Sequence, residues 1–269
     1  MPLDRISYWN LPPVVRNTIE ETTGAVTSAA PVGAGLNSSV AAVVRTPQGR
    51  YFVKALPTDH RWVWTQAREA EIAPYLTAVA PALQARIVVQ DWDVLVFEAL
   101  HGSQADYTPG SADLDRVAHL LTRIGDVPCP DIELREASQR LQKYADEADL
   151  HHFAGPALLH TDLNNANIIV SADRARIVDW GWATRGAPWL DTAYWVIWLI
   201  AAGHEPSHAE KLAATVPSWQ HASDNGIDAF AAANTRLWTE IAGHQPDPFT
   251  TPLKNAARRW HEYRTSLRR

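Results

Sequence analysis

The sequence predicts an α+β fold in which a small β-rich lobe precedes a larger helical lobe that contains one short β-hairpin. Short runs of β-branched and aromatic residues, bounded by Pro and Gly, dominate the first hundred residues. Apolar residues at helical spacing dominate most of the remainder. At 269 residues the chain is long enough for two lobes. We therefore place an N-lobe at residues 1–100 and a helical C-lobe at residues 101–269.

The N-lobe is predicted to contain strands and two helices, in the order helix 12–22, strands 40–46 and 50–57, helix 61–80, and strands 86–90 and 94–100. Pro47-Gln48-Gly49 is a hairpin-type turn between the first two strands, and residues 91–93 form the turn between the last two. Thr58 or Asp59 is available as the cap of the second helix.

The C-lobe is predicted to be helical over residues 111–127, 133–153, 227–243 and 253–269, and from about Asp191 onward. Ser207 and Glu210 have the spacing of a capping box. Between these helices, two β-rich runs at 167–170 and 175–178 flank a turn, which predicts a short β-hairpin.

Charge and cysteine content exclude several classes of protein. The net charge of −6 disfavours non-specific nucleic-acid binding, and a single cysteine, Cys129, cannot form a disulfide within the chain. The N-terminus lacks the pattern of a signal peptide, and no apolar run reaches the length of a membrane span. We therefore expect a cytoplasmic protein with no nucleic-acid or membrane partner, either monomer or dimer. The basic run at 253–269 reads as a solvated helix rather than a phosphate-binding tail.

A polar cluster interrupts the apolar run LLHTDLNNANIIV at residues 158–170. His160, Asp162 and Asn167 have the spacing H-x-D-x-x-x-x-N, and Asp179 ends the second strand of the predicted hairpin. In kinase-type phosphoryl transfer, an Asp at this position accepts the proton of the attacking hydroxyl, and the Asn and the second Asp bind metal. Carboxylate and amide oxygens suit Mg²⁺. The spacing predicts Asp162 as the catalytic base and Asn167 and Asp179 as magnesium ligands.

A phosphate-covering loop is predicted in the glycine-rich residues 32–40. Gly33 and Gly35 would let the backbone approach phosphates, and Ser38 or Ser39 could donate hydrogen bonds to them. The alternative is an ordinary glycine-rich turn.

Lys54 lies between apolar neighbours in the strand that follows this loop, which favours contact with nucleotide phosphates over an edge position. Glu69 and Glu71 on the next helix could pair with it, but they are about 200° apart around the helix axis, so at most one faces the cleft. We choose Glu69, because Ile72 and Leu76 place it beside the apolar stripe.

Residues 94–102 run as a strand into the junction of the lobes, where adenine would bind the backbone. Phe97 would lie at the back of the pocket, with the Glu98 carbonyl and the Leu100 amide as adenine partners. An ordinary strand end is the alternative.

The order of the segments GxG, Lys54, Glu69, FEALHG, HTDLNNAN and VDWGWA resembles the aminoglycoside phosphotransferase family of small-molecule kinases, whose protein-kinase-like fold also includes choline and homoserine kinases. The resemblance covers about residues 25–200. It implies a bilobal kinase-like fold, ATP or GTP with Mg²⁺ as cofactors, and a small-molecule hydroxyl as acceptor. It further implies that Asp191 braces the catalytic loop, and His160 is expected to support that loop through hydrogen bonds.

The chain departs from the family in several places. Thr161 stands where the family usually has Gly, and Trp180 replaces the Phe of protein kinases. Aminoglycoside-modifying members often carry acidic residues near the C-terminus, whereas this chain ends in a basic segment, which argues against a polycationic acceptor. An activation loop and an A-P-E segment are missing, which argues against a protein kinase.

The sequence leaves the acceptor open. Trp182 and Trp189 could stack on a sugar or nucleoside ring, or pack in the core. An antibiotic such as an aminoglycoside, a sugar or a nucleoside is one class of acceptor, and a metabolite of the choline, homoserine or sugar type is another. A pseudokinase that binds nucleotide or a protein partner without catalysis is the remaining alternative.

Overall fold

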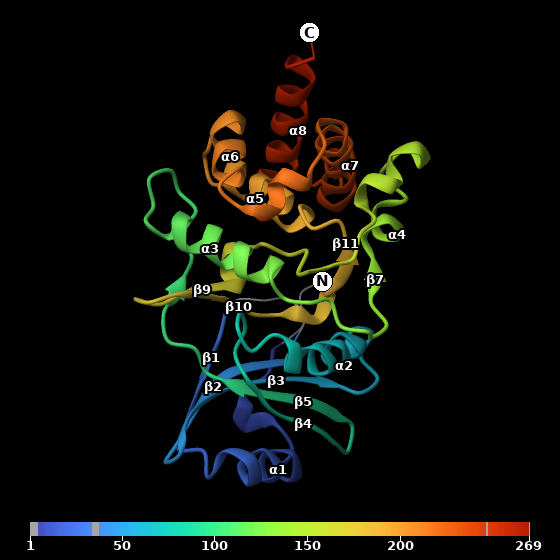
Figure 1. Ribbon diagram of the computed structural model, residues 1–269. Helices are drawn as coiled ribbons and strands as arrows, with labels where there is room; N and C mark the ends of the chain where they lie inside the picture. Colours follow the sequence, from blue (N-terminus) through green and yellow to red (C-terminus); the bar gives the residue numbers. More distant parts are fainter. Residues whose placement is uncertain (1–4, 34–37, 246, 269) are drawn as a thin grey trace. The chain divides into compact units, whose positions relative to one another are not determined.

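The computed structural model describes residues 5–33, 38–245 and 247–268, and Figure 1 shows how its elements follow one another. The chain divides into two compact units. The first unit comprises residues 1–103 and 176–182, and the second comprises residues 104–175 and 183–269. Among the described residues, no helix is long and apolar enough to span a membrane.

The first unit is built on an antiparallel sheet with the strand order β1-β2-β3-β5-β4. The strands are β1 (Ser28–Pro31), β2 (Val40–Thr46), β3 (Gly49–Pro57), β4 (Leu83–Val89) and β5 (Trp92–Glu98). Lys54 of β3 pairs with Ala41 of β2 on one side and with Leu95 of β5 on the other. This register places Lys54 in the middle of the sheet rather than at its edge.

The two faces of the sheet carry different side chains. Val53 and Ala55 of β3 pack in an apolar core with Val15 and Ile19 of α1 (Pro13–Thr23). Because successive side chains of a strand point to opposite faces, Lys54 points to the other face, which α2 (Val63–Ile72) covers in Figure 1. The pleat of β3 thus directs the lysine toward α2.

The helix predicted over residues 61–80 is shorter in the structure. α2 ends at Ile72, and a 3-10 turn, η2 (Ala73–Tyr75), follows it. Pro74 lies in this turn and lacks the N–H that would continue the α-helical hydrogen bonds. Pro74 lies within the range predicted as helical, so the sequence contains the residue that ends the helix.

Two predicted helix caps are wrong. α2 begins after Trp62, which has no side-chain cap, and neither Thr58 nor Asp59 is in the N-cap position. Ser207 lies inside α6 (Pro206–Ala213), whose N-cap is Glu205, also without a side-chain bond. In α6, Pro206 supplies a preset φ at the first helical position and starts the helix two residues earlier than a cap at Ser207 would.

The turn between β4 and β5 is at Gln90 and Asp91 rather than at residues 91–93. Gln90 has a φ of 50°, in the left-handed region that tight two-residue hairpin turns require. Trp92 and Asp93 therefore belong to β5, where Asp93 is buried.

The second unit is mainly helical. Its helices are α3 (Asp113–Gly125), α4 (Ala137–Leu141), α5 (Leu190–Ala201), α6, α7 (Asp224–Ala242) and α8 (Thr250–Ser266), with the 3-10 turns η3 (Glu147–Phe153), η4 (Asn165–Asn167) and η6 (Pro217–His221). α5 is apolar around most of its circumference, and nine of its residues are buried. A helix of this kind forms the core on which its neighbours pack.

Short strands complete the fold. β7 (Arg135–Glu136), β11 (Thr184–Gly186) and β8 (Ala157–Leu159) form one three-stranded sheet. β10 (Ala175–Ile177), β9 (Ile168–Val170) and β6 (Ser103–Gln104) form another, and the turn η5 (Trp180–Trp182) follows β10. The predicted hairpin is present as β9 and β10, whereas β1, β6, β7 and β11 were not predicted.

The helix predicted over residues 133–153 is broken. Only α4 is α-helical within it, and η3 follows after a turn. Leu134, Ala137 and Leu141 are buried at helical spacing, but the polar residues after Leu141 offer no apolar stripe that could hold a helix against the core.

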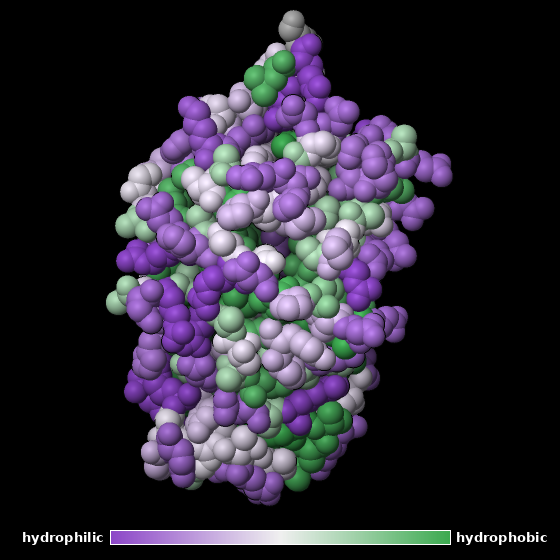
Figure 2. Space-filling model, in the orientation of Figure 1, coloured by the Kyte–Doolittle hydropathy of each residue, from purple (hydrophilic) through white to green (hydrophobic). Residues whose placement is uncertain are grey.

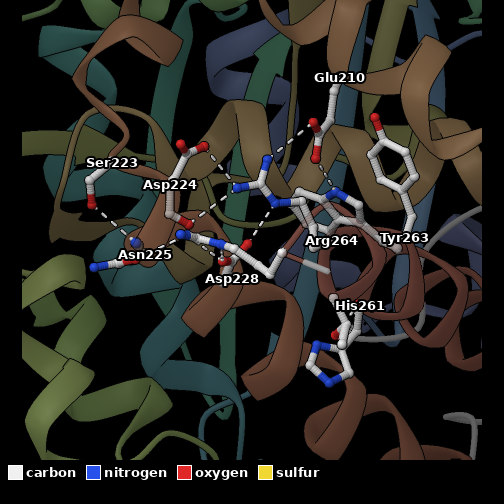
Figure 3. A network of polar contacts seen from close by, with 12 residues as sticks. Glu210, Ser223, Asp224, Asn225, Asp228, His261, Tyr263 and Arg264 are labelled. Carbon is white, nitrogen blue, oxygen red and sulfur yellow. Dashed lines mark hydrogen bonds and ion pairs between the residues drawn. The ribbon is translucent and has the colours of Figure 1, made fainter.

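Arg264 of α8 is the centre of an ion-pair network that ties α8 to α6 and α7 (Figure 3). Its side chain is 7% exposed and contacts three carboxylates, those of Glu210 at 3.4 Å, Asp224 at 2.9 Å and Asp228 at 2.6 Å. Burial by itself lowers the pKa of Arg264, but the hydrogen bonds to Asp224 and Asp228 raise it above its ordinary value. The same hydrogen bond from Arg264 holds the pKa of Asp224 below its ordinary value.

The basic charge of the C-terminal helix is therefore largely matched within the second unit. Arg268 lies 2.7 Å from the second oxygen of Asp228, and Arg259 lies 3.1 Å from Glu205. Hydrophilic residues cover most of the surface that α6, α7 and α8 present in Figure 2. The predicted solvated helix is correct for much of α8, but Arg264 is buried.

We expect Arg264→Met to lower the free energy of unfolding by about 3 kcal/mol, because the substitution leaves three carboxylates without their shared cation. Arg264→Lys should lose about half of this, since an ammonium cannot reproduce the planar fork of the guanidinium. Urea unfolding at neutral pH measures both changes.

Arg258→Met is the matched control, because the pair of Arg258 with Glu262 is exposed and 3.9 Å long. It should change the free energy of unfolding by less than about 0.5 kcal/mol.

The pKa of Asp224 gives a second test, in which pH is varied. Its pKa is lowered in the folded state, so its contribution is present above the unfolded value of about 4 and is lost as the pH falls through the folded value. The difference in the free energy of unfolding between the native protein and Arg264→Met should therefore become smaller at acid pH. An equal loss of unfolding free energy in Arg264→Met and Arg258→Met would contradict a stabilising role for the Arg264 network.

Candidate active site

Lys54 lies between two carboxylates in the first unit. Its Nζ is 2.9 Å from Oδ1 of Asp179 and forms an ion pair with Glu69 of α2. Lys54 and Glu69 are 7% and 4% exposed, whereas the Asp179 side chain is 33% exposed. The fold thus brings together three of the predicted residues, two of which are 125 positions apart in the chain.

One ammonium is shared by two carboxylates in this cluster. Burial by itself lowers the pKa of Lys54, but the charges of Asp179 and Glu69 raise it above its ordinary value. Burial raises the pKa of Glu69, with Lys54 opposing the shift and Asp179 reinforcing it. The lysine is therefore charged at neutral pH, and the half-exposed Asp179 is the group of the three that a cation can reach.

Of the two glutamates considered on α2, Glu69 faces the lysine. The Glu71 side chain is 49% exposed and lies 3.5 Å from Arg68 on the surface of the helix. The spacing argument from the sequence therefore described the orientation of both side chains.

The turn that carries Asp179 is anchored on α2. Asp179 has a φ of 68°, a left-handed conformation that Asp adopts more readily than most residues. The backbone N–H of Trp180 donates to Glu69, and the Trp180 ring is 2% exposed. A Cβ on Gly181 would lie only 2.8 Å from Cβ of Thr65, so the close approach of the turn to α2 requires glycine.

The predicted phosphate loop is described only at its ends. Gly33 is exposed, and a Cβ placed on it would meet no atom within 4 Å. Ser38 and Ser39 are 9% and 7% exposed, and the Ser39 N–H donates to the Ala55 carbonyl at 3.0 Å, which leads the chain into β2. Gly35 lies outside the described residues. The phosphate contacts of this loop stay predictions.

The predicted adenine segment lies at the end of β5. Phe97 is 5% exposed, Glu98 is the last residue of the strand, and Leu100 follows two positions later. The Glu98 carboxylate also accepts a hydrogen bond from Arg176 at 2.9 Å, a contact that the sequence did not predict. The roles of the three residues toward adenine stay predictions.

In the second unit, His160, Asp162 and Asn167 come together in the loop between β8 and β9. Nδ1 of the buried His160 accepts a hydrogen bond from the Asp162 N–H at 3.2 Å. Nδ2 of Asn167 donates to Oδ2 of Asp162 at 3.0 Å and to its carbonyl at 3.2 Å. Because Nδ2 faces Asp162, the amide Oδ1, which is the kind of atom Mg²⁺ prefers, is directed elsewhere.

Asp191 of α5 holds the start of this loop. It is 4% exposed, and its two oxygens accept hydrogen bonds from the N–H groups of His160 and Thr161, both at 2.8 Å. Burial raises the pKa of Asp191, and the hydrogen bond from His160 opposes the shift. These are the contacts expected of a residue that braces the loop.

Thr161 adopts a conformation that glycine would adopt without strain. Its φ is 68°, which is unusual for a β-branched residue. Its hydroxyl accepts a hydrogen bond from Arg140 of α4 at 2.6 Å, and Arg140 also donates to the Thr184 hydroxyl at 2.6 Å. Sequence reasoning missed Arg140, because no local pattern joins residues 21 positions apart.

Tyr107 is a second supporting residue that the sequence did not reveal. It is 3% exposed, and its hydroxyl donates to the carbonyl of Leu163, next to Asp162, at 3.0 Å. Its own carbonyl accepts from Nε2 of His204 at 2.8 Å. Tyr107 lies in the polar run HGSQADYTPGS, so nothing in its surroundings in the sequence indicates burial.

The two tryptophans that were considered for the acceptor lie in different settings. In the first unit, Trp182 clusters with Trp62 and Trp64 at centroid distances of 5.3 and 5.0 Å, and none of the three rings is fully buried. In the second unit, Trp189 is 3% exposed and packs against the rings of Phe153, Trp219 and Phe230. Trp189 thus takes part in core packing, and Trp182 presents part of its ring to solvent.

Comparison with solved structures identifies the fold. The chain aligns with choline kinase LicA from Streptococcus pneumoniae at a TM-score of 0.63 and 14% identity, over 93% of this chain and 98% of that one. It aligns with aminoglycoside phosphotransferase APH(4)-Ia at a TM-score of 0.59 and 11% identity, over 94% and 98%. The macrolide 2'-phosphotransferase MphH from Brachybacterium faecium gives a TM-score of 0.54 and 15% identity, over 93% and 98%.

The fold is that of choline kinases and aminoglycoside phosphotransferases. The protein-kinase-like α+β fold predicted from the sequence is therefore confirmed. No family model and no curated protein matches the sequence. The similarity of the chain to these solved structures thus lies in the fold of its backbone, at 11–15% sequence identity.

The strain at Thr161 gives a stability test. We expect Thr161→Gly to be more stable than Thr161→Ala by about 1 kcal/mol, because both lose the hydroxyl and only glycine relieves the left-handed φ. Thermal or urea unfolding of the two variants measures the difference.

Thr235 is the control, because it lies inside α7 and its hydroxyl also takes part in a hydrogen bond, to the Ala231 carbonyl at 2.9 Å. There the order should be reversed, with Gly less stable than Ala by about 1 kcal/mol. If Ala is the better residue at both positions, Thr161 is not strained.

Proposed function

We propose that this protein is an ATP- and Mg²⁺-dependent phosphotransferase that transfers the γ-phosphoryl group to a hydroxyl of a small molecule, with GTP as a possible donor. The observation that carries the proposal is the Lys54 ammonium held between Glu69 and Asp179. This cluster lies in a chain whose fold is shared with small-molecule phosphotransferases.

The nucleotide would bind through the β-rich unit. The charged Lys54, steadied by Glu69, would contact the phosphates, while the loop with Gly33, Gly35, Ser38 and Ser39 would cover them. Phe97, Glu98 and Leu100 would receive the adenine. Solved structures of LicA with AMP and of APH(4)-Ia with ADP and hygromycin B support a nucleotide site in this fold.

The donor set suits magnesium. Asp179 offers a half-exposed carboxylate and Asn167 an amide oxygen, which are hard ligands. Among the described residues there is no group of three or more His, Cys, Asp or Glu side chains that could hold a metal. In kinases Mg²⁺ uses few protein ligands, and nucleotide phosphates and waters supply the others. When bound, the ion would neutralise charge on the transferring phosphoryl group.

Asp162 would act as the base. In the proposed step its carboxylate takes the proton of the acceptor hydroxyl, the acceptor oxygen bonds to the γ-phosphorus, and the bond from that phosphorus to the bridging oxygen of ADP breaks. The Asn167 Nδ2 bond at 3.0 Å orients the carboxylate, and His160 and Asp191 fix the backbone of the loop. These contacts would orient the Asp162 carboxylate, and Asp162 would not itself be a metal ligand.

The acceptor class has two candidates. Hygromycin B is bound by APH(4)-Ia, and a macrolide phosphotransferase shares the fold, which supports an antibiotic acceptor. Choline kinase LicA supports a metabolite acceptor. The basic C-terminal helix counts less against a cationic acceptor than the sequence indicated, since Arg264 and Arg268 are paired with acidic residues.

We expect Asp162→Asn to lower kcat for phosphoryl transfer by about 10²- to 10⁴-fold, because the amide cannot take the acceptor proton. The Kd for Mg·ATP should change little, since the proposed role of Asp162 is toward the acceptor hydroxyl rather than the nucleotide. The assay follows γ-phosphate transfer from Mg·ATP and Mg·GTP to a panel of aminoglycosides, macrolides, nucleosides, sugars and amino alcohols.

Asp115→Asn is the control, because this carboxylate is exposed on α3. It should leave transfer unchanged. Transfer that survives Asp162→Asn at full rate would remove Asp162 from the role of base. Nucleotide binding without transfer to any acceptor, and without hydrolysis, would favour the pseudokinase. A protein that binds neither ATP nor GTP would disprove the proposed function.

A further inference from the structure

Gln66 is a buried polar residue on α2 for which the proposed chemistry has no direct use. It is 0% exposed, and its Nε2 donates a hydrogen bond to the main-chain carbonyl of Asp93 in β5 at 2.6 Å. The bond joins the helix that carries Glu69 to the sheet that carries Lys54. Both elements belong to the first unit.

The amide of Gln66 is not placed there to maximise stability. Its Oε1 is buried and has no hydrogen-bond partner among the described residues. A buried polar atom without a partner costs about 1–3 kcal/mol, which offsets the roughly 1 kcal/mol that the hydrogen bond to Asp93 contributes, so an apolar side chain of similar shape should not weaken the fold. The amide at this position therefore points to a role other than stability.

The acceptor of this hydrogen bond is itself held rigidly. Asp93 is 2% exposed, and its carboxylate is bound by Arg86 of β4, with Nη2 at 2.6 Å and Nε at 3.2 Å from Oδ2. Asp93 also pairs with Val88 of β4 and with Leu56 of β3. The carbonyl that receives Gln66 is thus a fixed point of the sheet.

Gln66 and Glu69 share one face of α2. Residues three apart on a helix are about 60° apart around its axis, and the buried positions of α2 are Thr65, Gln66, Glu69 and Ile72. The first turn of α2 has no side-chain cap that would fix its start. The bond from Gln66 to Asp93 therefore sets the rotation of the helix about its axis one turn before Glu69.

We propose that Gln66 is a positioning residue for the Lys54–Glu69 pair, and that its amide holds α2 in the rotation at which Glu69 keeps Lys54 ready for nucleotide phosphates. This inference rests on the proposed function. Gln66 is 0% exposed, so it would act only through Glu69 rather than by touching nucleotide or acceptor. Its removal should therefore weaken nucleotide binding without weakening the fold.

The test is a double-mutant cycle of Gln66→Met and Glu69→Gln, with Mg·ADP and Mg·AMP-PNP binding measured by calorimetry. Methionine conserves the unbranched shape and removes the amide. We expect Gln66→Met to raise Kd about tenfold while Tm stays equal or rises, because the unpartnered Oε1 is gone. In the Glu69→Gln background the same substitution should change Kd by less than about twofold.

Gln84→Met is the matched control, because this exposed glutamine of β4 also donates to a backbone carbonyl, that of Ala82 at 3.4 Å. It should leave Kd unchanged. Gln66→Leu repeats the test if the methionine variant does not fold. Three outcomes would overturn the inference. The Kd of Gln66→Met could be unchanged, its tenfold effect could persist in the Glu69→Gln background, or its Tm could fall together with nucleotide binding. If the native protein binds no nucleotide, the proposed function fails instead, so the two failures are distinguishable.

Discussion

The arrangement of the first unit depends on one buried ammonium. A charged lysine that is 7% exposed must be paired, because an isolated buried charge is far too costly to retain. Lys54 meets this need with Glu69 from α2 and Asp179 from a turn 125 positions later in the chain. A strand, a helix and a turn are thereby held at one point.

In the second unit, contacts to the backbone of the loop position the Asp162 carboxylate. Asp191 fixes the N–H groups that precede Asp162, and Tyr107 holds the carbonyl that follows it. Arg140 secures the hydroxyl of Thr161 at the strained position. These contacts fix the backbone of the loop on both sides of Asp162, which is the preorganisation that the proposed role of Asp162 would require.

Local signals in the sequence were reliable where neighbouring residues decide the outcome. The strand at 40–46 matches β2, and the turn at Pro47 and Gln48 follows from residues within four positions. Prediction failed where a segment needed a distant partner. Residues 133–153 look helical in isolation, but only α4 has an apolar stripe to bury, and β7 and β11 form because they pair with each other across almost fifty positions.

The sequence by itself determined the fold class, and the spacing of His160, Asp162, Asn167 and Asp179 along a loop and a hairpin was enough to predict the groups that the proposed function uses. Only the tertiary structure decided how those groups are supported. Arg140, Tyr107 and Gln66 are ordinary polar residues in sequence, and each becomes significant through one hydrogen bond to a distant atom. The physical reason is that burial and pairing of a polar group depend on which segments pack around it, and no local pattern encodes that choice.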